Sequence, residues 1–241
     1  MTRCADTRAA PEDTQQYLRQ VRAVIAAALP AGSLESRLPL ITTEWGYCTA
    51  CNWSHSPHLV SETMQGAYLL RMALSNAAVG VRLTTVYCLT DGPDTGLQPN
   101  SYGLLRRDCD VACVYEPKVA YSVAKTLASV LKGDRDTVPR LLNATYNGDG
   151  AAKAMELQLH SQPSPLLVWL AVSDPTATAS VTVQLVSAPD TCFKVVSMTG
   201  HATDHESLCT RADGSLVVPR ASAMPLYLFP SVGALEPIAL K

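Results

Sequence analysis

The stretch Leu38-Pro-Leu-Ile-Thr-Thr-Glu-Trp-Gly46 decides how the first half of the chain is interpreted. It is a short run of apolar and β-branched residues closed by a glycine, which is typical of a buried parallel strand. Its one acidic residue, Glu44, falls at the carboxyl end of this strand. An isolated buried charge is costly, so a carboxylate there is hydrogen-bonded, solvated or functional. Glu44 is therefore the first candidate for chemistry, with a solvated strand-end carboxylate as the alternative.

Helical patterns lie on both sides of this strand. Apolar residues recur at helical spacing before it, and a nearly apolar helix that Ser61 can cap follows it. Strands that alternate with helices imply a parallel sheet with right-handed crossovers. The elements expected around the first strand are a helix at 12–29, a helix at 61–78, a strand at 81–89, a long loop at 90–117 and a helix at 118–131.

From Arg140 onward, short strands alternate with turns rich in Pro, Asp and Gly, at the spacing of a sandwich. The predicted fold class is α/β plus all-β. Residues 1–136 would form the final βα units of a (β/α)₈ barrel, and residues 137–241 a C-terminal antiparallel β-sandwich. A complete barrel takes about 250 residues, and the barrel-like part is roughly half of that. Open strand edges present unpaired backbone groups that can pair with another strand, so we expect a homo-oligomer or a partner that covers them.

The composition suits a packed globular protein, with 47% apolar and 17% charged residues. The net charge of −2 gives no basic face for nucleic acid. No apolar run approaches the roughly 20 residues that cross a bilayer. The first residues lack the apolar stretch of a signal peptide, so a secreted parent protein would carry its signal upstream.

Eight cysteines permit disulfides, and Cys192 with Cys209 flank a predicted hairpin, which makes them the first pair to expect. The pairs Cys48-Thr-Ala-Cys51 and Cys109-Asp-Val-Ala-Cys113 raise the question of zinc. They lack the compact pattern of a zinc knuckle. We therefore expect neither a metal nor another cofactor.

Several stretches resemble clan A glycoside hydrolases, of the β-xylosidase/α-iduronidase type and the similar cellulase types. Each stretch is short, but their order and spacing over residues 12–132 are specific together. The first two matching stretches correspond to the seventh barrel strand of that family, which carries the nucleophile, and to the eighth strand with its loop. The matching stretches are Leu40-Ile-Thr-Thr-Glu-Trp-Gly46, Val86-Tyr-Cys-Leu-Thr-Asp-Gly-Pro-Asp94, Ser101-Tyr-Gly-Leu-Leu-Arg-Arg-Asp108 and Glu116-Pro-Lys-Val-Ala-Tyr-Ser-Val-Ala-Lys-Thr-Leu127.

The resemblance implies hydrolysis of O-glycosyl bonds by a retaining mechanism, with Glu44 as the nucleophile and a glycoside as the substrate. Tyr87 would occupy the position of an aromatic under the reacting sugar, although packing in the barrel is an equal reading. Asp91 would bind sugar hydroxyls, or simply belong to a turn. Trp53 and His58 follow Glu44 on a loop, where a Trp can stack on a sugar and a His is more often solvated.

One departure from the family bears on activity. The family's acid/base carboxyl lies in an Asn-Glu pair at the end of the fourth strand, and this chain contains no Asn-Glu. Three hypotheses follow. The chain is a glycosidase completed by a missing half or a partner, an inactive remnant that binds carbohydrate or protein, or a small enzyme that has recruited Asp91 or Glu62.

Overall fold

The computed structural model describes residues 11–30, 33, 39–49, 60–92, 101–109, 112–132, 137, 139–146, 152–160, 163–185, 190–203 and 207–231. The chain forms two compact units, Met1–Tyr121 and Ser122–Lys241, and helix α3 (Val119–Val130) crosses this division. The division between domains after residue 136 stays a prediction. No helix in the described ranges is long and apolar enough to cross a membrane.

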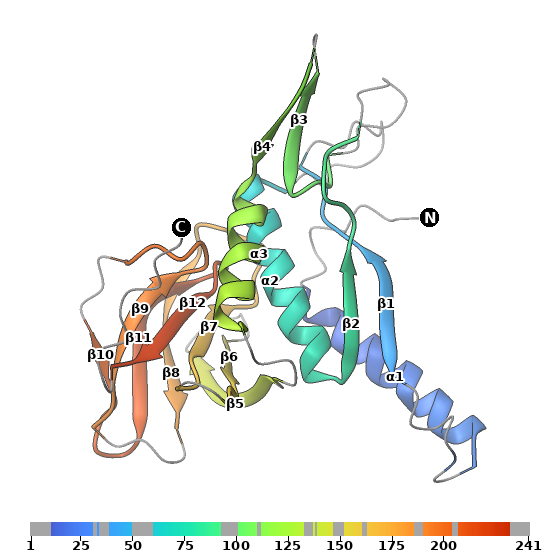
Figure 1. The fold of residues 1–241 in the computed structure, drawn as a ribbon. Coiled ribbons are helices and arrows are strands. Elements are labelled where there is room, and N and C mark those ends of the chain that lie inside the picture. Colours follow the sequence, from blue (N-terminus) through green and yellow to red (C-terminus); the bar gives the residue numbers. More distant parts are fainter. Residues whose placement is uncertain are drawn as a thin grey trace. The chain divides into compact units, whose positions relative to one another are not determined.

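The first unit begins with α1 (Asp13–Ala28), β1 (Leu40–Trp45), α2 (Glu62–Ala78) and β2 (Val81–Val86), as Figure 1 shows. The predicted alternation of helix and strand is confirmed for these elements. Strands β1 and β2 pair in parallel, with Leu40 opposite Val81 and Trp45 opposite Val86. Their carboxyl ends therefore lie at the same edge of the sheet.

The prediction that β1 is a buried strand is wrong. Ile41 and its register partner Leu83 are 53% and 56% exposed. Helix α2 packs against β2, where the Asn76 side chain donates a hydrogen bond to Thr84 Oγ1 at 3.2 Å. Within the described residues the sheet has two strands, and the face that carries Ile41 and Leu83 stays open. Apolar composition predicted the strand but could not supply the neighbours that would bury it.

Helix α2 is the central element of this unit. Ser61 caps it, because its Oγ accepts a hydrogen bond from the Met64 N–H at 3.2 Å, as predicted. Most of the helix from Met64 to Asn76 is buried, which fits its nearly continuous apolar composition. Arg71 is fully buried and forms a bidentate pair with Glu12, at 2.9 and 2.8 Å. This pair fixes the start of α1 to the middle of α2.

The predicted loop at 90–117 contains a β-hairpin, which corrects the sequence interpretation. Strand β3 (Leu105–Cys109) pairs antiparallel with β4 (Cys113–Pro117), and the hairpin extends away from the helices in Figure 1. Every residue of β4 is exposed. Because neither face of the hairpin is buried, its strands lack the apolar alternation on which strand prediction depends.

The second unit contains eight antiparallel strands in one sheet, in the order β10-β9-β12-β7-β6-β5-β8-β11. The sequence predicts strands at 154–159, 166–172, 180–186, 193–198, 215–218 and 226–229, which are confirmed within a few residues, and β5 and β10 are additional. The strands are β5 (Pro139–Tyr146), β6 (Ala152–Leu157), β7 (Leu166–Leu170), β8 (Thr178–Gln184), β9 (Cys192–Ser197), β10 (Leu208–Cys209), β11 (Ser215–Ser222) and β12 (Leu226–Pro230).

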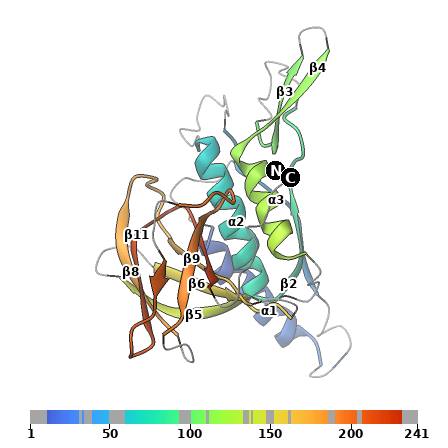
Figure 2. The ribbon, with the colours of Figure 1, turned by 60° about the vertical axis from the view of Figure 1, so that its left-hand side comes forward.

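Strand β5 joins the two halves of the predicted sandwich into one continuous sheet. Its first half, 139–142, pairs with β6, and its second half, 143–146, pairs with β8. The sheet curves in Figure 2. Val168, Val183 and Leu216, which lie on three different strands, belong to one cluster of buried hydrophobic residues. The unit is therefore an antiparallel, nearly closed sheet with its own apolar core.

Candidate functional site

Glu44 and the residues that follow β2 lie at the same sheet edge. The Tyr87 N–H donates to the Trp45 carbonyl at 2.8 Å, which extends the parallel pairing to the last residue of β1. Glu44 is exposed, one residue before that end. The structure thus places Glu44, Tyr87 and Asp91 near the carboxyl ends of two adjacent parallel strands, where open α/β sheets and barrels carry their reactive groups.

Asp91 is the centre of a buried polar network. Its Oδ1 accepts hydrogen bonds from the Lys118 ammonium at 2.7 Å and from the Gly103 N–H at 2.8 Å. Lys118 is buried and also donates to Thr49 Oγ1 at 3.2 Å and to the Ser101 carbonyl at 3.3 Å. One ion pair therefore joins the segment after β1, the segment after β2 and the start of α3.

Gln65 on α2 contacts the same segments through its side-chain amide. Its amide nitrogen donates to the Tyr47 carbonyl at 2.8 Å and lies 3.2 Å from the Tyr102 carbonyl and 3.4 Å from the Gly103 carbonyl. These partners are all acceptors, so the amide orientation is determined. Gln65 Oε1 is buried and has no hydrogen-bond partner among the described residues. A single side chain thus fixes two strand-end segments to one helix.

Two glycines allow these segments to approach each other. A Cβ on Gly46 would lie 2.2 Å from the Tyr87 carbonyl oxygen, and a Cβ on Gly103 would lie 2.2 Å from the Asp91 backbone nitrogen. Both contacts are with backbone atoms, which cannot move aside as a flexible side chain does. Gly46 and Gly103 are therefore required by the close backbone packing of the site.

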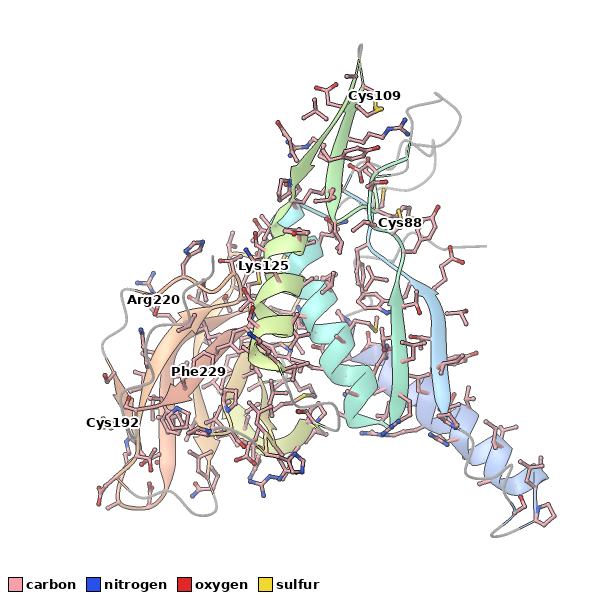
Figure 3. All side chains as sticks on the ribbon, viewed as in Figure 1. Cys88, Cys109, Lys125, Cys192, Arg220 and Phe229 are labelled. Carbon is pink, nitrogen blue, oxygen red and sulfur yellow. A yellow bond between two sulfur atoms is a disulfide. The ribbon has the colours of Figure 1, made fainter. Side chains whose placement is uncertain are left out.

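Cys88, labelled in Figure 3, follows β2, and its thiol donates to the Thr90 carbonyl at 3.0 Å. Among the described residues it is the one free cysteine. Burial raises the pKa of the Cys88 thiol above its ordinary value, and the charge of Asp91 acts in the same direction. The Glu44 carboxylate also raises this pKa, whereas Lys118 lowers it. The charges of Asp91, Glu44 and Lys118 therefore all act on the pKa of the Cys88 thiol.

The Tyr87 ring packs against other side chains. Its ring meets Tyr102 edge to face, with centroids 5.8 Å apart, and it joins a small cluster with Cys48 and Cys88. The stacking role that the resemblance implied for Tyr87 stays a prediction. Trp53 and His58 lie outside the described residues.

No group of three or more His, Cys, Asp or Glu within the described ranges could hold a metal ion. Cys109 and Cys113 form a disulfide with each other rather than half of a zinc site, and the predicted pair Cys192–Cys209 is confirmed. The described residues thus offer a carboxylate, a thiol and an ion pair as the chemical groups of this edge.

Sequence reasoning missed three contributors to the site. Cys88 and Lys118 stand within the matching stretches without a role there, and Gln65 lies outside them. A polar residue inside a nearly apolar helix was the signal for Gln65, because such a residue must find partners when buried. No comparable signal identified Lys118, since the network depends on the hairpin that brings Gly103 and Lys118 together.

No family model matches this chain, and no curated protein matches its sequence. Among solved structures, the fold is similar to that of the GH51 arabinofuranosidase from Xanthomonas axonopodis pv. citri, with a TM-score of 0.61 and 11% identity. That similarity covers 91% of this chain and 46% of the arabinofuranosidase, so the chain spans less than half the length of that neighbour. SrfJ from Salmonella typhimurium gives a TM-score of 0.37 at 11% identity, over 88% of this chain and 38% of that one. The chain therefore shares its fold with part of a glycoside hydrolase.

Proposed function

We propose that this chain is the C-terminal part of a retaining glycoside hydrolase, with Glu44 as the nucleophile. In this proposal, residues 1–136 supply the last βα units of a (β/α)₈ barrel and residues 137–241 the accompanying β-domain. The substrate is an O-glycoside. Because the structural neighbour is an arabinofuranosidase, an α-arabinofuranoside is the first substrate to test.

The observation that carries the proposal is the position of Glu44. It lies near the carboxyl end of a parallel strand, next to the end of a second parallel strand that brings Cys88 and Asp91 to the same edge. In a retaining mechanism a carboxylate attacks the anomeric carbon while a second carboxyl, about 5–5.5 Å away, protonates the leaving oxygen. Glu44 would perform the attack, and water would then release the sugar from the ester that forms.

Asp91 and Glu62 are the candidates for the second carboxyl. Asp91 uses Oδ1 to hold Lys118 and the Gly103 N–H, which suits a residue that positions the site. Glu62 pairs with Arg106 of the hairpin. These two contacts argue against either residue as the recruited acid. The proposal therefore takes the acid/base from outside the described residues or from a second polypeptide.

A panel of aryl glycosides, incubated with the chain and its Glu44→Gln variant, tests the proposal. We expect activity that disappears in the variant and survives in Glu156→Gln, which removes a carboxylate of the second unit. A Glu44→Ala variant with added azide gives a sharper answer, because a small anion replaces a missing nucleophile and leaves a glycosyl azide. Hydrolysis that persists in Glu44→Gln would contradict the assignment of Glu44.

A second candidate is a catalytically inactive remnant that binds carbohydrate or protein. The open face of the two-stranded sheet favours it, since Ile41 and Leu83 lie side by side there and are more than half exposed. In this reading a second copy of the chain, or a partner, covers the sheet. Sedimentation of the purified chain is then expected to give a dimer or larger, and a clean monomer at low concentration would count against it.

A further inference from the structure

The outermost described residues of the β3–β4 hairpin carry a disulfide that has no role in the proposed function. Cys109 and Cys113 are the last register pair of the hairpin, and both are exposed. Figure 3 labels Cys109 there, away from the helices of its unit. Local opening of an exposed hairpin costs little compared with opening a packed core, so a solution thiol can reach these sulfur atoms.

A guanidinium lies against both sulfur atoms. Arg107 Nε is 2.8 Å from Cys109 Sγ, and Arg107 Nη2 is 3.4 Å from Cys113 Sγ. Thiolates form most easily beside a fixed positive charge. Thiol–disulfide exchange is faster when the sulfur that leaves is stabilised as a thiolate. Arg107 is therefore placed to accelerate opening of this disulfide, and its shorter contact favours Cys109 as the leaving sulfur.

The second resolved disulfide provides a comparison within the same chain. Cys192, which is partly buried, and Cys209, which is exposed, join β9 to the edge strand β10 of the eight-stranded sheet. They enclose a sequence separation of 17 residues, against 4 for the hairpin pair. A cross-link stabilises a fold less when its loop is shorter. Loss of the hairpin disulfide should therefore leave the fold intact.

We propose that Cys109–Cys113 is a site of thiol–disulfide exchange, opened selectively by dithiol reductants with Arg107 stabilising the departing sulfur. The thiolate of the reductant attacks Cys113 Sγ, the bond between the two cysteine sulfurs breaks, and Cys109 leaves as a thiolate beside Arg107. The second thiol of the reductant, as its thiolate, then attacks the mixed disulfide and releases Cys113 as a thiolate. Two electrons pass to the protein, the reductant becomes a cyclic disulfide, and the protein thiolates take up two protons.

The test is partial reduction of the folded chain with dithiothreitol without oxygen, quenched with iodoacetamide and followed by peptide mapping. We expect Cys109 and Cys113 to be alkylated at least about tenfold faster than Cys192 and Cys209. A monothiol, glutathione, should leave its adduct on Cys113. Equal rates for the two disulfides, or earlier opening of Cys192–Cys209, would overturn the proposal.

The role of Arg107 has its own control in the same hairpin. Arg106 carries the same charge but pairs with Glu62 and Glu116. We expect Arg107→Gln to slow opening of the hairpin disulfide about threefold and Arg106→Gln to leave its rate unchanged. The opening rate of Cys192–Cys209, measured in each sample, reports whether the second unit of the variant is folded, and hydrogen exchange of α2 reports on the first unit. An Arg107→Gln rate equal to that of the unaltered chain would remove Arg107 from the mechanism.

Discussion

Strands β1 and β7 have similar apolar beginnings and very different surroundings. Strand β7, with the sequence Leu-Leu-Val-Trp-Leu, is buried at every position, and its neighbours β6 and β12 pair with it on both sides. Strand β1 begins Leu-Ile-Thr-Thr, yet half of its residues are exposed, and β2 is its one strand partner within the described residues. The difference shows that an apolar run establishes a strand, whereas burial depends on how many neighbours the rest of the chain supplies.

The two units also differ in the interactions that stabilise each unit internally. The second unit has an aliphatic core in which Val181, Val183 and Leu216 are fully buried. In the first unit, two buried ion pairs connect the segments. Arg71 of α2 pairs with Glu12 at the start of α1, and Lys118 pairs with Asp91 at the sheet edge. An apolar core tolerates small errors in position, but a buried ion pair loses its stabilising effect when one partner is removed.

The largest effect is therefore expected from Lys118→Met. This change leaves the buried Asp91 carboxylate without its cation, which costs about 3–5 kcal/mol in the free energy of unfolding. Arg140→Met is the matched control, because the Arg140–Glu156 pair is partly exposed, with side chains 48% and 23% accessible, and is worth about 0–1 kcal/mol. Urea unfolding, with hydrogen exchange resolved for α2 and β7, would assign the loss to the first unit. A loss no greater than that of Arg140→Met would show that the Asp91 network is not structural.

A pair of leucines measures the difference between the two sheets directly. Leu167 in β7 is fully buried, whereas Leu83 in β2 is 56% exposed. Leu167→Ala should lower the free energy of unfolding by about 2–5 kcal/mol, because it leaves a cavity in a packed core. Leu83→Ala should change it by less than about 0.5 kcal/mol. Equal losses in urea titrations would mean that the face of Leu83 is covered in solution.

The sequence predicted the elements with strong local signals. Helix α2 has an N-cap at Ser61 and a nearly continuous apolar composition, and both β1 and β2 are short apolar runs next to a helix. The β3–β4 hairpin was missed because its residues are mostly exposed, so its strands lack the apolar alternation of a half-buried strand. Strand β5 was missed although Leu142, Ala144 and Tyr146 alternate along it as partly buried residues. Joining the second unit into one sheet depends on β5, and it could not be predicted without that strand.

For the candidate site, position in the strand order was predictable and the contacts were not. Glu44 and Asp91 follow from the rule that reactive groups gather at the carboxyl ends of parallel strands. The partners of Asp91 come from Gly103 and Lys118, on either side of the hairpin that the sequence did not reveal. A long-range ion pair between residues 27 positions apart leaves no periodic pattern in a single sequence.

The smallest expected effect tests whether Glu44 and Cys88 share one site, and it needs no catalytic activity. The reactive form of Cys88 is the thiolate, so its alkylation rate rises with pH up to the thiol pKa, which burial and nearby carboxylates raise. Glu44→Gln removes one of those negative charges, so the pKa of the Cys88 thiol should fall. At pH 8 the iodoacetamide rate at Cys88 would then increase, by up to about twofold. Glu156→Gln, which removes a carboxylate of the second unit, should have no effect. If the rate at Cys88 does not respond to Glu44→Gln, Glu44 lies outside the group of charges around the thiol, and the two residues do not share one site.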